Sequence, residues 1–154
     1  MNPPVLKIKK LHPDAILPIY ATPGAACFDL YALLPDHLNR RTIALNNMAP
    51  CIVRTGLAFE IPAGWSMLIF SRSGHGFKGD VRLANCVGVI DADYTGEVMV
   101  KLTSDAVHEW DFLISHGDRI AQAMLVQIPQ VQMLEVDALS ETERGAGGFG
   151  STGA

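Results

Sequence analysis

The sequence NCVGVIDADYTGEVM occupies residues 85–99 and consists of two apolar runs separated by a polar turn. The first run, Cys86–Ile90, is almost entirely apolar, and the second, Glu97–Leu102, alternates apolar and other residues. Both patterns are typical of β-strands, and the segment between them ends in Gly96. The stretch therefore predicts a β-hairpin.

One carboxylate, Asp91, falls where the first strand of this hairpin stops. Beside a largely apolar sheet, burial can shift the pKa of such a group into the range that a general base needs. Tyr94 in the turn offers a flat ring to a ligand, and the main chain near Val89 and Met99 is expected to line one slot. Asp and Gly also favour ordinary turns, so this stretch alone leaves a plain hairpin turn open as an alternative.

The composition indicates one globular domain. The chain has 154 residues, of which 49% are hydrophobic and 18% charged. No apolar run reaches the length of a membrane span, and the lysines near the N-terminus are not followed by the apolar segment of a signal peptide. We therefore expect a cytoplasmic protein that does not bind membranes.

Charge and cysteine content exclude further classes. The formal net charge of -4 argues against broad nucleic-acid binding, although a local basic cluster could still bind a small anion. The three cysteines are widely spaced, and the five histidines lack ligand spacing. These numbers and spacings suggest neither a disulfide framework nor a zinc site, and they fit a reducing compartment.

Short strands separated by Gly and Pro turns dominate the rest of the chain. This pattern predicts an all-β barrel or jelly roll. The expected strands outside the hairpin are Val5–Leu11, Cys27–Leu33, Arg41–Leu45, Cys51–Ile61, Trp65–Phe70, a strand with Phe112 and Ile114 that ends at Ser115, Arg119–Ile128 and Val131–Val136, and Val81–Ala84 leads into the hairpin.

The sequence Ser71–Gly74 follows one of these strands directly. Ser71 is a candidate N-cap for a single helical turn that ends near Gly79. Hydroxyls, backbone N–H groups and Arg72 at a helix start would together bind an anion. A capped turn with a surface arginine is the alternative.

Three other polar residues lie in or beside apolar strands. Asp29 lies between Phe28 and Leu30 and either faces solvent or helps to organise a site. Gln122 shares a face with apolar residues, so it needs a partner that is either structural or a ligand. Arg119 is expected to form a structural ion pair.

The composition changes at residue 140, so we divide the chain into a β domain over residues 1–139 and a flexible Gly-rich tail over residues 140–154. The tail cannot bury enough apolar surface to order itself. Its Arg144 and Phe149 could close over a ligand that offers a phosphate and a flat ring, or the tail could simply be a disordered end.

Five separated stretches now occur in a recognisable order. They are Pro23–Ala32, Ser71–Gly76, Asn85–Gly96, Gly117–Gln122 and Arg144–Gly153. The set closely resembles the five motifs of the trimeric deoxyuridine triphosphate nucleotidohydrolases (dUTPases), and the resemblance spans nearly the whole chain. Its most specific parts are residues 88–94 and 144–150.

The resemblance implies a fold, an assembly and an activity. It implies a distorted jelly-roll subunit of the β-clip type and a homotrimer with three shared active sites. Members of this family cleave dUTP to dUMP and pyrophosphate, usually with Mg²⁺. That reaction limits uracil incorporation into DNA and supplies dUMP for dTMP synthesis.

Matching motif positions imply roles for single residues. Asp91 would activate the water that attacks the α-phosphorus, and Tyr94 would pack under the deoxyribose and exclude a 2′-hydroxyl. The uracil edge would be recognised by Asn85 and by backbone groups near Val89, Ile90 and Met99, and Phe149 would stack on uracil.

The remaining matches concern the phosphates and the metal. Arg72, Ser73 and Gly74 match the phosphate-binding loop. Gln122 matches a residue near the α-phosphate, and Arg144 matches a tail arginine that grips the γ-phosphate. Asp29 matches a residue that reaches the metal indirectly, through water.

Two other functions remain open. A dCTP deaminase shares this fold and a similar Ser-Arg-Ser loop, but it lacks the Gly-Gly-Phe-Gly tail and relies on a glutamate in place of the Asp91–Tyr94 arrangement. A non-catalytic trimer that senses nucleotides would have no need of Asp91 as a base.

Overall fold

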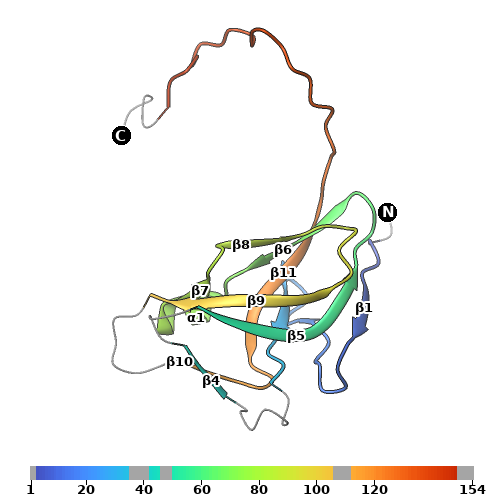
Figure 1. The fold of residues 1–154 in the computed structure, drawn as a ribbon, viewed down its shortest axis with the longest axis vertical. Coiled ribbons are helices and arrows are strands. Elements are labelled where there is room, and N and C mark those ends of the chain that lie inside the picture. The colour runs from blue at the N-terminus through green and yellow to red at the C-terminus, as the bar shows by residue number, and fades with distance from the viewer. Residues whose placement is uncertain (1–2, 35–41, 46–49, 106–111, 149–154) are drawn as a thin grey trace.

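The computed structural model describes residues 3–34, 42–45, 50–105 and 112–148. Within these ranges the chain forms short strands and one short helix (Figure 1). The elements are β1 Lys7–Lys10, β2 Ile19–Tyr20, β3 Phe28–Tyr31, β4 Thr42–Leu45, β5 Cys51–Glu60, β6 Trp65–Phe70, α1 Ser73–Gly79, β7 Val81–Leu83, β8 Val87–Ile90, β9 Glu97–Ser104, β10 Phe112–Ser115 and β11 Arg119–Gln127. The all-β prediction is confirmed.

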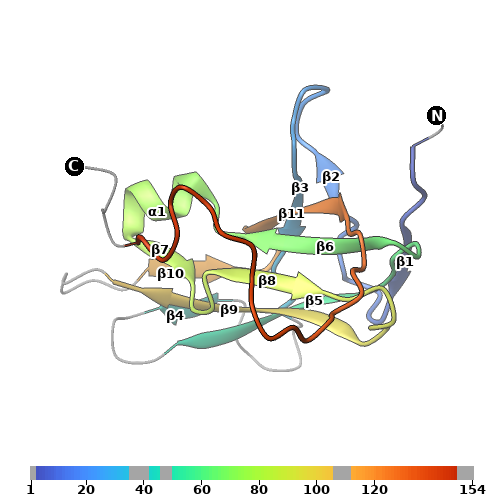
Figure 2. The same ribbon diagram turned by 90° about the horizontal axis from the view of Figure 1, so that it is seen from above.

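The strands form two main sheets and a small third one. One sheet has the order β1-β5-β9-β7, the second has the order β2-β3-β11-β6-β8, and β10 pairs with β4. Every pairing is antiparallel. Figure 2 shows β6 and β8 in one layer and β5 and β9 in the other, with α1 at one end.

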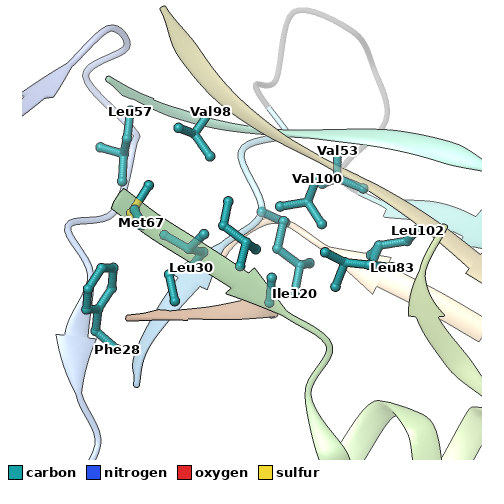
Figure 3. Packing of buried hydrophobic residues seen from close by; sticks show 14 of the residues in the cluster. Phe28, Leu30, Val53, Leu57, Met67, Leu83, Val98, Val100, Leu102 and Ile120 are labelled. Carbon is teal, nitrogen blue, oxygen red and sulfur yellow. The ribbon is translucent and has the colours of Figure 1, made fainter. Parts of the chain in front are cut away.

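The core lies between the two main sheets. Leu57 and Val98 from one sheet face Met67 and Leu30 from the other (Figure 3). Strand β5 shows how the sequence directs this packing, because its alternate side chains point to opposite faces. Its inward residues are Val53, Thr55, Leu57 and Phe59, with Ile61 beyond its end, and its outward residues include Arg54 and Glu60.

A β-bulge interrupts β5 between Arg54 and Ala58. Gly56 lies in this bulge with φ +68°, a left-handed conformation that glycine adopts without strain. A Cβ atom at this position would lie 2.6 Å from Leu33 Cδ2 and 2.8 Å from Ala15 Cβ. The bulge therefore brings the β5 backbone so close to Leu33 and Ala15 that only glycine fits at position 56.

The predicted hairpin is wrong in its pairing. Strand β8 pairs with β6, whereas β9 pairs with β5 and β7. Among the described residues no ladder joins β8 to β9, so residues 91–96 cross from one sheet to the other. Periodicity reveals a strand and its buried face, but it does not reveal the neighbouring strand.

Two further expectations about local structure are wrong. Ser71 does not cap the helix: Arg72 occupies the N-cap position, and Ser71 Oγ accepts a 2.9 Å hydrogen bond from the Leu83 backbone N–H. Residues 131–136 form no strand, because no strand among the described residues pairs with them. Figure 1 shows this segment leaving the body of the molecule, with Met133 91% exposed.

No helix in the described part of the chain is long and apolar enough to cross a membrane.

Candidate active site

A charged cleft lies beside the start of α1 and the neighbouring strands β3 and β11, which pair in one sheet. Its polar lining includes Asp29, Arg72, Ser73, Arg119 and Gln122. These residues come from separate parts of the sequence, and three of the predicted motifs contribute to them. The structure thus brings the predicted phosphate loop together with Asp29 and Gln122.

Asp29 is the centre of this cleft and is only 8% exposed. Its Oδ1 accepts a hydrogen bond from Arg72 Nε at 3.1 Å, and its Oδ2 accepts one from Arg119 Nη1 at 3.3 Å. A buried carboxylate needs such partners, because desolvation of an unpaired charge is costly. Asp29 therefore does not face solvent, and the prediction that Arg119 forms an ion pair is confirmed.

Arg72 is held from three sides. Besides Asp29, its Nη1 donates to the Arg119 backbone carbonyl at 3.2 Å and lies 3.4 Å from His75 Nε2. Among the described residues, no hydrogen bond involves Arg72 Nη2. That nitrogen is therefore available to an anion in the cleft.

Ser73 and Gly74 follow Arg72 as the first residues of α1, and both are exposed. Their N–H groups belong to the first turn and have no acceptor within the helix. A Cβ atom on Gly74 would meet nothing within 4 Å, so the backbone here is open to a ligand. The Gln122 amide has a structural partner, since Nε2 donates to the Ser71 carbonyl at 2.9 Å.

A second cleft lies where the chain crosses from β8 to β9. It is lined by Val89, Ile90, Asp91, Tyr94, Glu97, Val98 and Met99. The predicted slot between Val89 and Met99 is therefore present, although the two strands are not paired.

The turn shapes this slot through Tyr94. Its hydroxyl donates a 2.9 Å hydrogen bond to the Glu97 carbonyl. The ring lies so close to the turn that a Cβ on Gly96 would be 2.7 Å from Tyr94 Oη. Asp91 is exposed in this chain. The structure of one chain therefore does not show the expected burial of its carboxylate beside the sheet.

Glu97 is a residue of the slot that the sequence did not single out. Its carboxylate binds the Arg54 side chain, with Nη2 to Oε2 at 2.7 Å, and also accepts the Gly56 backbone N–H at 2.9 Å. Burial raises the pKa of Glu97, but the hydrogen bonds from Arg54 and Gly56 outweigh it and leave that pKa below its ordinary value. The two partners lie some forty residues away in sequence, so no local signal marks this contact.

Of the predicted site residues that the structure describes, Gly74, Asn85 and Arg144 line neither cleft. Asn85 is exposed just before β8, where its carbonyl accepts the Val87 N–H at 2.7 Å. Arg144 lies in the exposed tail, and its Nε donates to the Gly147 carbonyl at 2.8 Å. Phe149 lies outside the described residues. The two clefts share no lining residue within one chain.

Comparison with known proteins decides the family. A family model described as dUTPase matches residues 14–153. The deoxyuridine 5′-triphosphate nucleotidohydrolase of Caulobacter vibrioides is 45% identical over 150 residues, which covers 96% of this chain and 94% of that protein. This chain belongs to the dUTPase family. The dUTPase-like protein of Nautilia profundicola, named a deoxyuridine 5′-triphosphate nucleotidohydrolase, is 42% identical over 96% of this chain and 98% of its own length.

Solved dUTPase structures share the fold. The Staphylococcus bacteriophage 80alpha dUTPase with dUpNHpp superposes with a TM-score of 0.81 at 26% identity, covering 97% of this chain and 99% of that chain. A mutant dUTPase from phage phi11 of S. aureus, whose structure shows the coordination of a structural Mg(II) ion, superposes with a TM-score of 0.77 at 21% identity, covering 89% of this chain and 99% of that chain. The predicted jelly-roll-like dUTPase subunit is therefore confirmed.

Proposed function

We propose that this protein hydrolyses dUTP to dUMP and pyrophosphate by attack of water on the α-phosphorus. The observation that carries the proposal is dUTPase family membership over nearly the full length, in a chain that keeps Asp91 and Tyr94 in one cleft. The reaction would limit uracil incorporation into DNA and supply dUMP for dTMP synthesis.

Asp91 would act as the general base. Its exposed carboxylate lines the slot, where it would take a proton from a water molecule beside a bound nucleotide. General-base catalysis contributes on the order of 10²–10⁴ in rate. Electrostatic stabilisation of the phosphates by Arg72, Arg144 and a metal would supply much of the rest.

The slot would recognise the nucleoside. Tyr94 would form the floor under the deoxyribose and leave no room for a 2′-hydroxyl. The uracil edge would meet Asn85 and the main chain of Val89, Ile90 and Met99, and Phe149 would cover the base. Unpaired polar groups left by cytosine would reject dCTP by roughly 10⁴-fold.

The phosphates would lie in the charged cleft. Arg72, Ser73 and Gly74 would bind them, Gln122 would stand near the α-phosphate, and Arg144 would bind the γ-phosphate. Arg72 supports this role because its Nη2 has no hydrogen bond within the described part of the chain, and the exposed start of α1 adds backbone donors. The tail over residues 140–154 would close over the β domain of residues 1–139, and closure would exclude water.

We propose a homotrimer in which each active site draws on three chains. The charged cleft and the slot share no lining residue in one chain. Residues 129–148, here called the arm, leave the body of the molecule (Figure 1), and Arg144 belongs to them. That arm carries exposed apolar side chains, including Val131, Met133 and Leu134, which a neighbouring copy would cover.

We propose Mg²⁺ as the cofactor. In the described part of the chain no three His, Cys, Asp or Glu side chains gather as a metal site, and both Asp29 oxygens bind arginines. This donor set fits a Mg²⁺ ion that is held mainly by phosphate oxygens and water, with Asp29 reaching it through water. The ion would neutralise phosphate charge. A cytoplasmic location stays a prediction.

The test is a product assay. The purified protein is incubated with Mg²⁺ and equal amounts of dUTP, dCTP, dTTP and UTP, and all products are separated by chromatography. Selective loss of dUTP with equal amounts of dUMP and pyrophosphate supports the proposal. Loss of dCTP would favour a deaminase, and dUTP binding without turnover would favour a sensor.

Asp91→Asn tests the base. We expect less than about a tenth of the wild-type turnover, with dUTP binding retained. A variant that keeps more than this would overturn the role of Asp91. The exposed neighbour Asp93 provides a matched control, because Asp93→Asn removes the same charge from the same turn.

A further inference from the structure

His75 is a half-buried imidazole beside the charged cleft that neither motif matching nor the proposed mechanism uses. It lies in the first half of α1 and packs edge-on against the Phe112 ring, with centroids 5.1 Å apart. The same ring supports the end of the helix, since a Cβ on Gly79 would clash with Phe112. This packing fixes where the imidazole can point.

The hydrogen-bond chemistry assigns its protons. Arg72 Nη1 can only donate, so His75 Nε2, 3.4 Å away, must be the unprotonated acceptor. In the neutral ring the proton then lies on Nδ1. That atom is buried and has no hydrogen-bond partner among the described residues.

We propose that His75 is a positioning residue that, as a neutral imidazole, fixes the Arg72 guanidinium for the phosphates of the substrate. Asp29 holds Nε, while His75 and the Arg119 carbonyl hold Nη1. These three contacts restrain the guanidinium through Nε and Nη1, and Nη2 has no hydrogen bond among the described residues. The inference rests on the proposed dUTP hydrolysis.

The surrounding charges keep the ring neutral. Burial lowers the pKa of His75 below its ordinary value, and the nearby positive charges of Arg72 and Arg119 lower it further. Asp118 and Asp29 act in the opposite direction but do not reverse the shift. Protonation at acid pH would turn Nε2 into a donor that faces the Arg72 donor, and the contact would be lost.

Two variants of His75 separate positioning from packing. His75→Gln places an amide oxygen within reach of Arg72, whereas His75→Leu fills the space against Phe112 without an acceptor. The first measurement is the Kd of the analogue dUpNHpp, together with kcat and KM for dUTP. Loss of one such hydrogen bond should raise Kd and KM about 3- to 10-fold in His75→Leu, with kcat changed less than about 2-fold. His75→Gln should stay within about 2-fold of wild type.

A double-mutant cycle with Arg72→Ala makes the test specific. If His75 acts through Arg72, then adding His75→Leu to Arg72→Ala should change the Kd of dUpNHpp by less than about 1.5-fold. An equal effect of His75→Leu in both backgrounds would overturn the inference, as would the absence of any effect beside a normal Arg72.

A pH series covers the case in which His75→Leu does not fold. Between about pH 8 and pH 5 the wild-type Kd should rise more than that of His75→Gln, because glutamine does not titrate. Parallel pH profiles would overturn the inference. Wild-type turnover of dUTP, measured first, keeps the two proposals apart: a wild type that neither binds nor cleaves dUTP overturns the proposed function, whereas unchanged His75 variants of an active enzyme overturn only the inference.

Discussion

Replacing Asp29 with Asn should destabilise the protein far more than the loss of one surface charge. The asparagine has nearly the same shape, and its oxygen can still accept from Arg72 Nε. Its NH₂ group, however, would face the Arg119 donor that Asp29 Oδ2 now accepts at 3.3 Å. Both arginines would lose their counter-charge.

The exposure of each partner sets the magnitude. The Arg72 side chain is 19% exposed and that of Asp29 is 11%, so their contact is a largely buried charge-assisted hydrogen bond worth about 1.5–3 kcal/mol. The Arg119 side chain is 49% exposed, and solvent screening reduces its share to about 0–1 kcal/mol. We expect a loss of about 2–4 kcal/mol, which corresponds to a fall in Tm of about 5–15 °C for a chain of this size.

Thermal unfolding of wild type and variant at one fixed protein concentration measures this effect, because the Tm of an oligomer depends on concentration. Glu60→Gln is the matched control. The Glu60 side chain is 64% exposed and pairs with that of Lys7, which is 67% exposed. The Tm of the Glu60→Gln protein should therefore differ from that of wild type by less than about 2 °C. An Asp29→Asn protein that melts within about 2 °C of wild type would refute the argument.

The remaining predictions concern the bulge and the slot. Gly56→Ala should cost about 2–4 kcal/mol in urea unfolding, whereas Gly64→Ala, which has φ +80° but open space around it, should cost only about 1 kcal/mol; equal costs would show that the contacts at Gly56 do not matter. The pKa of Glu97 is lowered in the folded protein, so the ionised carboxylate contributes its full stabilisation above the ordinary pKa of 4.5. That contribution is lost as the pH falls through the lowered pKa of the folded state. Acid should therefore reduce the Tm of wild type more than that of Glu97→Gln. Tyr94→Phe removes the hydroxyl bond to the Glu97 carbonyl and should cost about 0.5–1.5 kcal/mol; an unchanged urea midpoint would argue against that bond.

Much of the fold could be predicted because strand alternation is a local property. The inward and outward faces of β5 follow directly from its sequence, and β6 and β10 end where turn residues or polar residues follow them. The chain segments that carry Asp91, Arg72 and Gln122 could likewise be found, because each motif is contiguous.

The site itself could be predicted only in part. The slot near Asp91 and Tyr94 is present, yet it lies between two sheets and not within a hairpin. The ion pair that buries Asp29 against Arg72 and the contact between Glu97 and Arg54 could not be predicted from the sequence. Each of them joins residues about forty positions apart. Side-chain partners of this kind arise only when strands from distant segments become neighbours.

The sequence by itself determined most of the strand-forming segments, their apolar faces and the motif residues that the chain carries, since these depend on neighbours along the chain. The tertiary structure alone decided that β8 and β9 enter different sheets, that Asp29 binds two arginines and that His75 contacts Arg72. The physical reason is that alternation specifies the buried face of a strand but not the strand beside it. Hydrogen bonds and ion pairs between distant residues depend on which strands become neighbours.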